Sequence, residues 1–245
     1  MMPFSPKPKV TLSVRPAALP KAHRIVLGGL ELVPHLSGAL HVPEFRALII
    51  SDLHFEQGTS LARRGIRVPP YDTAITLALL ETILAEIKPE RLILLGDSFH
   101  DGEGETRIED VLMLRLHAIA AAHECFWICG NHDPLPPRNL AGHAADRIAL
   151  GPLTLRHAPA KLVPEEIEIS GHLHPGCAVS QRGRRVAGKC FIADSRRLIM
   201  PAFGAYTGAL SVFADPYRGL FAHEETQVWM LGRQQLYKFP FQRLG

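Results

Sequence analysis

The sequence has few cysteines and lacks any long hydrophobic run. Its 245 residues include four cysteines, at positions 125, 129, 177 and 190, and no two of them are spaced as CxxC. This spacing predicts no disulfide framework. The longest apolar stretches, such as 47–50 and 92–95, are far shorter than the roughly 18 residues of a membrane-spanning helix, so we expect no membrane partner.

The N-terminus also lacks the apolar segment of a secretory signal. Residues 1–21 contain five prolines and several lysines but no apolar stretch of about 7–15 residues. We therefore expect a cytoplasmic protein with reduced cysteines. The net charge of +3 is too small to indicate a partner by itself, and a hydrophobic content of 47% excludes a chain that is disordered throughout.

Histidine, by contrast, is abundant. The chain has 13 histidines, and histidine is the commonest metal ligand in proteins. The length favours a single domain. Because prolines interrupt residues 1–22 repeatedly, we expect a proline-rich arm there and one domain over residues 23–245.

Short apolar runs alternate with helical patterns over residues 46–129. Runs of this kind are typical of strands that are buried on both faces, and the apolar stripe from Ile75 to Ile87 is typical of a helix that begins near Asp72. The order strand, helix, strand, helix, strand favours parallel pairing. Beyond residue 147, Gly and Pro turns separate shorter strands and predict a second, more antiparallel sheet. The predicted strands are 46–51, 91–95, 124–129, 153–156, 166–170, 185–192, 198–200, 227–231 and 235–239, and the predicted helices are 72–87 and 108–122.

Metal-ligating side chains follow five of these predicted strands. Because ligands bind beyond the carboxyl ends of parallel strands, these side chains are expected at one edge of the molecule. In an extended chain, residues i and i+2 point the same way, so Asp52 and His54 can bind one ion together. The candidate ligands are Asp52 and His54, then Asp97, then Asn131, then His157, and finally His172 and His174.

The candidate ligands combine hard oxygen donors with imidazole nitrogens. That mixture suits Mn²⁺, Fe²⁺ or Zn²⁺ better than Ca²⁺. Seven candidates exceed the need of one ion, and a carboxylate can bridge two ions, so the pattern favours a pair of divalent ions. Each histidine alone is as well explained by ordinary packing, but packing does not explain why all of them follow strand ends.

The ordered motifs DLH, GD, GNHD, H and GHLH resemble the calcineurin-like metallophosphoesterase superfamily over residues of about 46–175. A narrower resemblance, in RRGIRVPPYDT at 63–73, LHP at 173–175 and PAFGAYTG at 201–208, is to bacterial ligase-associated DNA damage response endonucleases. The resemblance implies a four-layer α/β/β/α sandwich of two mixed sheets, two Mn²⁺ ions (Fe²⁺ or Zn²⁺ being alternatives) and hydrolysis of DNA phosphodiester bonds.

Carried over by position, the resemblance implies two ligand sets that share Asp97. Asp52, His54, Asp97 and His174 would hold one ion, and Asp97, Asn131, His157 and His172 would hold the other. It also implies that His132 faces the scissile phosphate as a catalytic residue. Asp133 either orients the His132 imidazole or has an ordinary structural role, and the sequence leaves both interpretations open.

Candidate DNA contacts flank these motifs, because a DNA-binding site needs positive charge along the path of the strand. Single-stranded bases also stack on aromatic side chains, for which Phe55, Tyr71 and Tyr206 are candidates. Short basic clusters are, however, more often solvated surface. The candidate substrate-binding residues are Arg63, Arg64, Arg67, Tyr71 and His100, with a second basic group at Arg182, Arg184 and Arg185.

The resulting hypothesis is a binuclear-metal phosphodiesterase that acts on DNA, as an endonuclease on single-stranded DNA in DNA repair. A phosphomonoesterase or a small-nucleotide phosphodiesterase with the same metal centre is the alternative, because the motifs do not distinguish these substrates. A non-catalytic scaffold is disfavoured, since every apparent ligand is retained. The resemblance also implies functional association with an ATP-dependent DNA ligase, a helicase and another nuclease.

Overall fold

The computed structural model describes residues 23–181, 183–222 and 224–244. The predicted arm at 1–22 and one arginine of the second basic group, Arg182, lie outside these described residues. None of the helices within the described ranges is long and apolar enough to cross a membrane.

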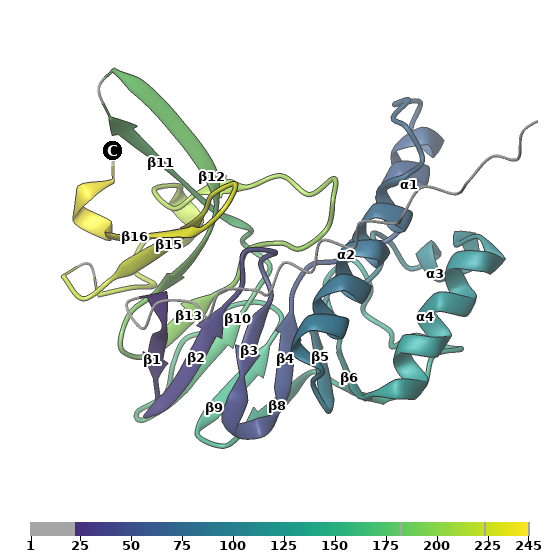
Figure 1. Ribbon diagram of the computed structural model, residues 1–245, viewed down its shortest axis with the longest axis horizontal. Coiled ribbons are helices and arrows are strands. Elements are labelled where there is room, and N and C mark those ends of the chain that lie inside the picture. Colours follow the sequence, from purple (N-terminus) through teal and green to yellow (C-terminus); the bar gives the residue numbers. More distant parts are fainter. Residues whose placement is uncertain (1–22, 182, 223, 245) are drawn as a thin grey trace, which may run out of the picture.

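The first sheet has seven strands in chain order (Figure 1). β1 to β4 pair antiparallel, and β4 to β7 pair parallel. The short 3-10 helix η2 (Pro43–Phe45) connects β3 to β4. The strands are β1 (Ile25–Leu27), β2 (Leu30–Pro34), β3 (Leu40–Val42), β4 (Ala47–Ile50), β5 (Arg91–Leu95), β6 (Glu124–Ile128) and β7 (His143–Ala145).

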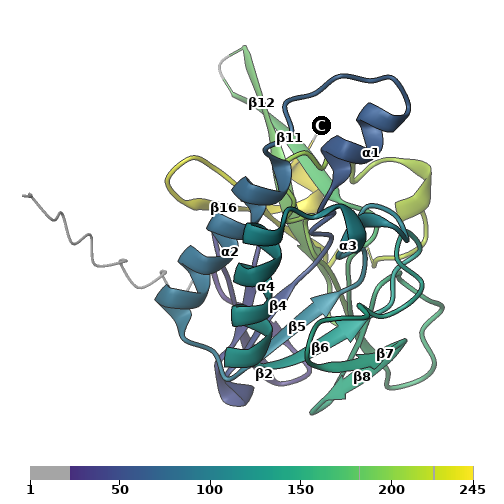
Figure 2. The ribbon, with the colours of Figure 1, turned by 90° about the vertical axis from the view of Figure 1, so that its right-hand side faces the viewer.

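Two of the four α-helices, α2 and α4, cover one face of this sheet, and α1 and α3 lie beyond the ends of its strands (Figures 1 and 2). Alternate residues of the central strands, such as Leu48 and Ile50, pack against the helices, where they meet Leu80 of α2 and Leu116 of α4. The helices are α1 (Gln57–Arg63), α2 (Asp72–Ile87), α3 (Gly104–Arg107) and α4 (Asp110–Ala122).

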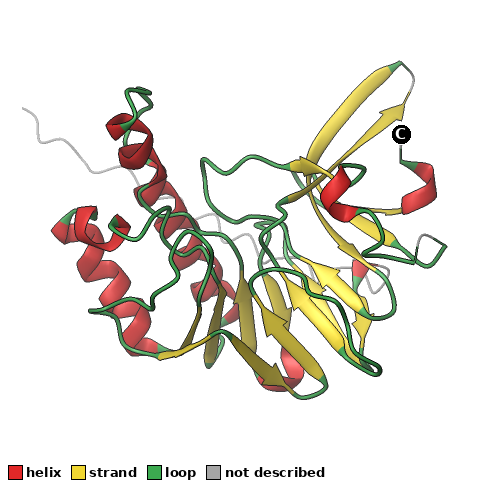
Figure 3. Ribbon diagram, turned by 180° about the vertical axis from the view of Figure 1, so that it is seen from behind, coloured by secondary structure: helices red, strands yellow, loops and turns green. Residues whose placement is uncertain are grey.

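The second sheet is mixed and lies against the other face of the first (Figures 1 and 3). β10 pairs parallel with both β9 and β13, while β11, β12, β15 and β16 form antiparallel pairs. Its strands are β8 (Arg147–Leu150), β9 (Leu153–Arg156), β10 (Ile167–Ser170), β11 (Pro175–Gln181), β12 (Arg184–Ala193), β13 (Arg197–Ile199), β14 (Leu210–Ser211), β15 (Gln227–Leu231) and β16 (Leu236–Pro240).

Three apolar layers hold the fold together. Ile49 and Ile93 point away from the helices and pack between the sheets against Phe191 and Trp229. The outer face of the second sheet is covered by Tyr217 and other residues in and around two 3-10 helices, η3 (Asp215–Tyr217) and η4 (Phe241–Arg243). The α/β sandwich of two mixed sheets is therefore confirmed, with 3-10 helices in the outermost layer.

The central elements agree closely with the sequence patterns. α2 and β5 have the predicted bounds, β6 ends one residue earlier than predicted, and β4 is one residue shorter at each end. The interpretation of the α2 stripe was partly wrong, because Ile75 is 51% exposed and Leu77 is buried instead. Asp72 is the first residue of α2, as expected, and its carboxylate accepts a hydrogen bond from the Gly58 amide.

Candidate metal centre

The first cluster of candidate ligands joins the two sheets. Asp52 and His54 follow β4 in the first sheet, and His174 follows β10 in the second. One potential ligand atom from each residue lies within 4.8 Å of the others. The Nε2 atoms of His54 and His174 are 3.4 Å apart, and His174 Nε2 is 3.3 Å from Asp52 Oδ1.

The second cluster draws on three different strand ends. Asp97 follows β5, His157 follows β9, and His172 follows β10. Their potential ligand atoms also lie within 4.8 Å of one another. His157 Nε2 is 3.1 Å from His172 Nδ1 and 2.9 Å from Asn131 Oδ1, so the side chain that follows β6 joins the same group.

Asp97 lies between the two clusters. Its Oδ2 atom is 3.7 Å from His54 Nε2 in the first cluster and 3.4 Å from His157 Nε2 in the second. Its other oxygen accepts a hydrogen bond from the His132 amide at 2.9 Å. The fold therefore brings all seven sequence-predicted ligands together, with one carboxylate in the middle.

A buried oxygen with no hydrogen bond supports metal binding at this site. Asp52 is fully buried, and its Oδ2 atom accepts hydrogen bonds from Ser51 Oγ and from the His172 amide. Its Oδ1 atom has no hydrogen-bond partner among the described residues. Because a buried carboxylate oxygen without a partner is costly, and this one faces imidazole nitrogens, the donor set fits divalent metal ions. Ser51, which anchors Asp52, was not predicted from the sequence.

The backbone at the candidate ligands adopts an uncommon conformation. Nine non-glycine residues in the described chain have positive φ, and five of them are candidate ligands. This conformation costs of order 1–3 kcal/mol per residue and clusters at functional sites. The extended geometry assumed for the first motif was therefore wrong, because the turn after β4 rather than strand alternation directs its two ligands. The five are Asp52 (φ 55°), His54 (46°), Asp97 (48°), His172 (65°) and His174 (46°).

Two glycines allow the motif loops to approach one another closely. A Cβ atom at Gly130 would overlap Asp97, and one at Gly171 would overlap the side chains of Ser51 and Asp52. Neither glycine has a positive φ, so space rather than backbone conformation requires it. The glycines that precede Asn131 and His172 thus let each loop pack directly against the ligand of another motif.

Burial and neighbouring charges shift the pKa values of several candidate ligands, often in opposite directions. Burial lowers the pKa of His54 to about 3, although the neighbouring carboxylates act in the opposite direction. Burial disfavours the ionised form of Asp97, but the hydrogen bond and charge of His157, the His132 amide and the charge of His54 together outweigh burial and lower the carboxyl pKa to about 2. His157 gains from the same pair: its pKa is raised to about 9 despite burial.

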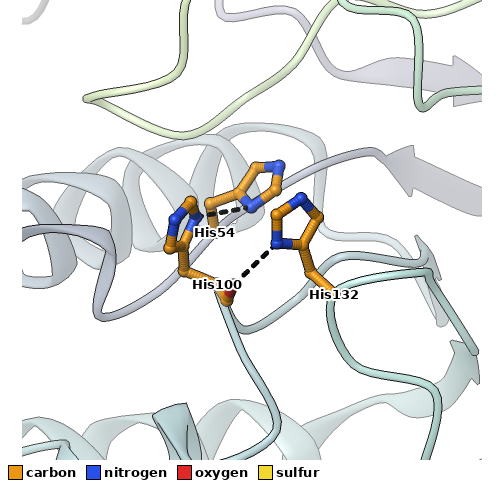
Figure 4. A group of neighbouring side chains, drawn as sticks. All are labelled: His54, His100 and His132. Atoms are coloured by element: carbon orange, nitrogen blue, oxygen red, sulfur yellow. Dashed lines mark hydrogen bonds between the residues drawn. The ribbon is translucent and has the colours of Figure 1, made fainter. Parts of the chain in front are cut away.

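His132 and His100 stand beside the first cluster (Figure 4). The His132 ring donates from Nδ1 to the His100 carbonyl oxygen at 2.8 Å, which leaves Nε2 available for a proton or a substrate. The Nδ1 atom of the His100 ring is 3.2 Å from His54 Nδ1, whereas His54 Nε2 faces His174 and Asp97. His100 therefore contacts a candidate ligand directly, and its carbonyl orients His132.

Asp133 does not orient the His132 imidazole. Its carboxylate accepts hydrogen bonds from the amides of Phe99 and Gly130 and so ties the loop after β6 to the loop after β5. Burial raises its pKa to about 6, and the charge of Asp97 acts in the same direction. Of the two interpretations left open by the sequence, the structural role is the one observed.

A family comparison accounts for these motifs together. The family model described as calcineurin-like phosphoesterase matches residues 45–192, a segment that contains every candidate ligand. The chain belongs to the calcineurin-like phosphoesterase family. Members of this family depend on two metal ions, and the clusters of histidine and aspartate around Asp97 agree with that requirement. The chain is thus a hydrolase of phosphoester bonds.

Solved structures extend the comparison beyond the matched segment. The crystal structure of the Pseudomonas putida nuclease MPE aligns with a TM-score of 0.68 and 26% sequence identity, covering 87% of this chain and 98% of that one. The E. coli phosphoesterase Yfce aligns with a TM-score of 0.41 and 15% identity, over 80% of this chain and 98% of that one. A comparison with curated protein sequences finds no significant match.

The segment between α1 and α2, residues 64–71, carries most of the first group of candidate DNA contacts, and we call this segment the rim. Arg64, Arg67 and Tyr71 are exposed in the segment between α1 and α2, while Arg63 ends α1 and forms an ion pair with Glu103. Arg63 therefore has a protein partner for its charge. Phe55 is 1% exposed and packs against Phe99, so it cannot stack on a base, and its prediction as a stacking residue was wrong.

A loop outside the family-model match supports the first metal motif. The amides of Phe203 and Gly204 donate to the carbonyl oxygens of Ser51 and Asp52, and the Tyr206 hydroxyl donates to Pro69 O. Lys189 on β12 donates to Ala202 O, Gly204 O and Thr207 Oγ1 at 2.7–3.0 Å. The PAFGAYTG segment thus braces Asp52. The role of Lys189 was missed, since a lone lysine in a strand carries no sequence signal.

Proposed function

We propose that this chain is a two-metal phosphodiesterase that hydrolyses DNA, as an endonuclease on single-stranded DNA in DNA repair. The central observation is the position of Asp97, whose Oδ2 atom lies between the two histidine clusters. A single carboxylate in this position is suited to be a ligand shared by two metal ions.

The two proposed ion sites use the seven candidate ligands. Asp52, His54 and His174 would hold one ion, Asn131, His157 and His172 would hold the other, and Asp97 would serve both. When bound, such ions lower the pKa of a water molecule and stabilise the phosphate charge in the transition state. We propose Mn²⁺ because oxygen and imidazole donors are mixed, and Fe²⁺ or Zn²⁺ would suit the same donors.

His132 is the proposed catalytic side chain. The hydrogen bond to the His100 carbonyl keeps a proton on Nδ1, so Nε2 either accepts a proton or, in the charged ring, donates one. Its ring stands edge-on to His54 with centroids 5.0 Å apart, which puts it at the border of the metal cluster. From there it can stabilise charge on the phosphate or protonate the departing oxygen.

Two observations support DNA as the substrate. The similar structure at 26% identity is that of a nuclease. In addition, Arg64 and Arg67 on one side of the site and Arg184 and Arg185 on the other are exposed and form no ion pair within the described part of the chain. Figures 1 and 2 show α1 and the β11–β12 hairpin projecting at the same end of the molecule. Unpaired cations on both sides suit a polyanionic strand.

Three further parts of the proposal rest on the sequence alone: composition and the N-terminus support the first two, and the family resemblance implies the third. These are a single domain over residues 23–245, a cytoplasmic location, and functional association with an ATP-dependent DNA ligase, a helicase and another nuclease.

The test compares two substrates with the Mn²⁺-loaded protein. Circular single-stranded DNA and a phosphomonoester are incubated in parallel, and linear product is resolved on a denaturing gel. We expect the circle to be opened, which an exonuclease cannot do, and the monoester to be hydrolysed far more slowly. Hydrolysis of the monoester while the circles stay intact would overturn the proposal in favour of the alternative function.

A further inference from the structure

A hollow of about 390 Å³ lies on the second sheet, beside the metal centre. Residues of β11, β12 and β14 and the segment around β14 form its walls, including Gly176, Arg185 and Phe213. None of the sequence motifs accounts for this hollow, and no candidate metal ligand lines it.

The hollow begins next to a candidate ligand. Gly176 in its wall is two residues beyond His174, a separation of at most about 7 Å along an extended chain. The His174 carbonyl accepts a hydrogen bond from the Leu210 amide, and the Gly176 carbonyl accepts one from Val212. The strand that presents His174 to the metals therefore continues directly as the floor of the hollow.

Phe213 gives the hollow an aromatic surface. Its side chain is 53% exposed, although it is a large apolar group. The Phe213 ring packs against Phe241 with ring centroids 5.0 Å apart, which holds the ring in place. An exposed ring with a fixed position provides a face on which a nucleobase can stack.

The charge around the hollow favours an anion. Its described lining includes two cations, Arg185 and Lys189, and no acidic residue. Lys189 is occupied by its three oxygen acceptors, whereas Arg185 is exposed and forms no ion pair within the described residues. The acidic residue that follows Phe213 most closely, Asp215, pairs with Arg218. Arg185 therefore remains available for a phosphate.

We propose that this hollow binds the nucleotide next to the scissile phosphate of a single-stranded DNA substrate. The base stacks on Phe213, and Arg185 pairs with the neighbouring phosphate. The inference rests on the proposed function and adds the path of the substrate: the single-stranded DNA leaves the metal centre along β11 and β12. The proposal rests on the aromatic face and the unpaired arginine of a hollow whose wall begins at Gly176, two residues beyond the candidate ligand His174.

The test separates strand binding from metal chemistry by using two substrates. Mn²⁺-loaded wild type, Phe213→Ala, Phe213→Trp and Arg185→Ala are assayed with circular single-stranded DNA and with bis(p-nitrophenyl) phosphate, a diester that has no nucleobase and no second phosphate. Tyr237→Ala and Arg147→Ala are the matched controls, because both residues are exposed on other strands of the same sheet. Thermal melting shows whether each variant is folded.

We expect Phe213→Ala to lower kcat/KM for DNA about tenfold, which is within the range that one base–aromatic stack contributes, and to leave hydrolysis of the small diester unchanged. Phe213→Trp should retain the DNA rate, because indole also stacks. Arg185→Ala should reduce the slope of log(kcat/KM) against log salt by about 0.7, the value for one phosphate contact in a single strand. Both control variants should behave as wild type.

Two contrary outcomes have different meanings. If wild type cleaves DNA and Phe213→Ala and Arg185→Ala cleave it equally well, the hollow serves another occupant and this inference is overturned while the proposed function stands. If wild type hydrolyses the small diester but no DNA, the proposed function fails, and the DNA subsite fails with it.

Discussion

Two regions of the site differ in how firmly they fix their functional residues. One is the sheet edge where the strands end, and the other is the rim between α1 and α2. At the edge, Asp52 and Asp97 are buried, and close glycine contacts and hydrogen bonds to other motif loops fix their positions. At the rim, Arg67 and Tyr71 are exposed in a segment between two helices. Metal ligands must be placed within fractions of an ångström, whereas a polyanion needs only positive charge along its path.

The largest expected effect comes from removing the carboxylate between the clusters. Asp97→Ala should lose both Mn²⁺ ions and all detectable diester hydrolysis, because Asp97 is the one candidate ligand placed in both proposed sites. Elemental analysis and the change of melting temperature on adding Mn²⁺ measure this loss. Asp110→Ala, an exposed carboxylate on α4, is the control. Full metal occupancy in Asp97→Ala would contradict a shared ligand.

His132→Ala should separate catalysis from metal binding. The variant should fold and bind Mn²⁺, because all seven candidate ligands remain. Its kcat should fall about 10²- to 10⁴-fold, the usual contribution of a general acid or base. His117→Ala, on α4, is the matched control. A turnover close to that of wild type would show that His132 has no part in the chemistry.

Gly130→Ala should disturb the edge without removing a functional group. The added methyl group would overlap Asp97, so we expect a loss of about 1–3 kcal/mol in the free energy of unfolding and weaker Mn²⁺ binding. In a chain of this length the melting temperature should fall by about 3–10 °C. In Gly208→Ala the new atom would meet nothing within 4 Å, so it should melt like wild type. Equal stability of the two variants would show that the close approach is not required.

The smallest effects are expected at the rim between α1 and α2. Arg67→Ala should reduce the slope of log(kcat/KM) for DNA against log salt by about 0.7, the value for the loss of one phosphate contact. Arg63→Ala should change it less, because Glu103 already neutralises Arg63. Measurement of kcat/KM at several salt concentrations decides between them. A larger effect of Arg63 than of Arg67 would mean that the ion pair opens when DNA binds.

Much of the central architecture could be predicted because local patterns and general topology both determine it. α2 and β5 have long or continuous apolar patterns, and the structure places them at the predicted residues. β1 to β3 were not predicted, since they are short and pack on only one face, as the alternating burial of β1 and β2 shows. Their pairing depends on contacts along the sheet that no local pattern encodes.

The sequence by itself determined which residue types stand at the five strand ends, because a buried apolar run followed by Asp, Asn or His is visible along the chain. The tertiary structure alone decided the rest of the site. It set Asp97 between the clusters, directed Asp133 to Phe99 rather than to His132, buried Phe55 and exposed Phe213. Those outcomes depend on packing between segments distant in sequence, where distances and burial are set by the whole fold.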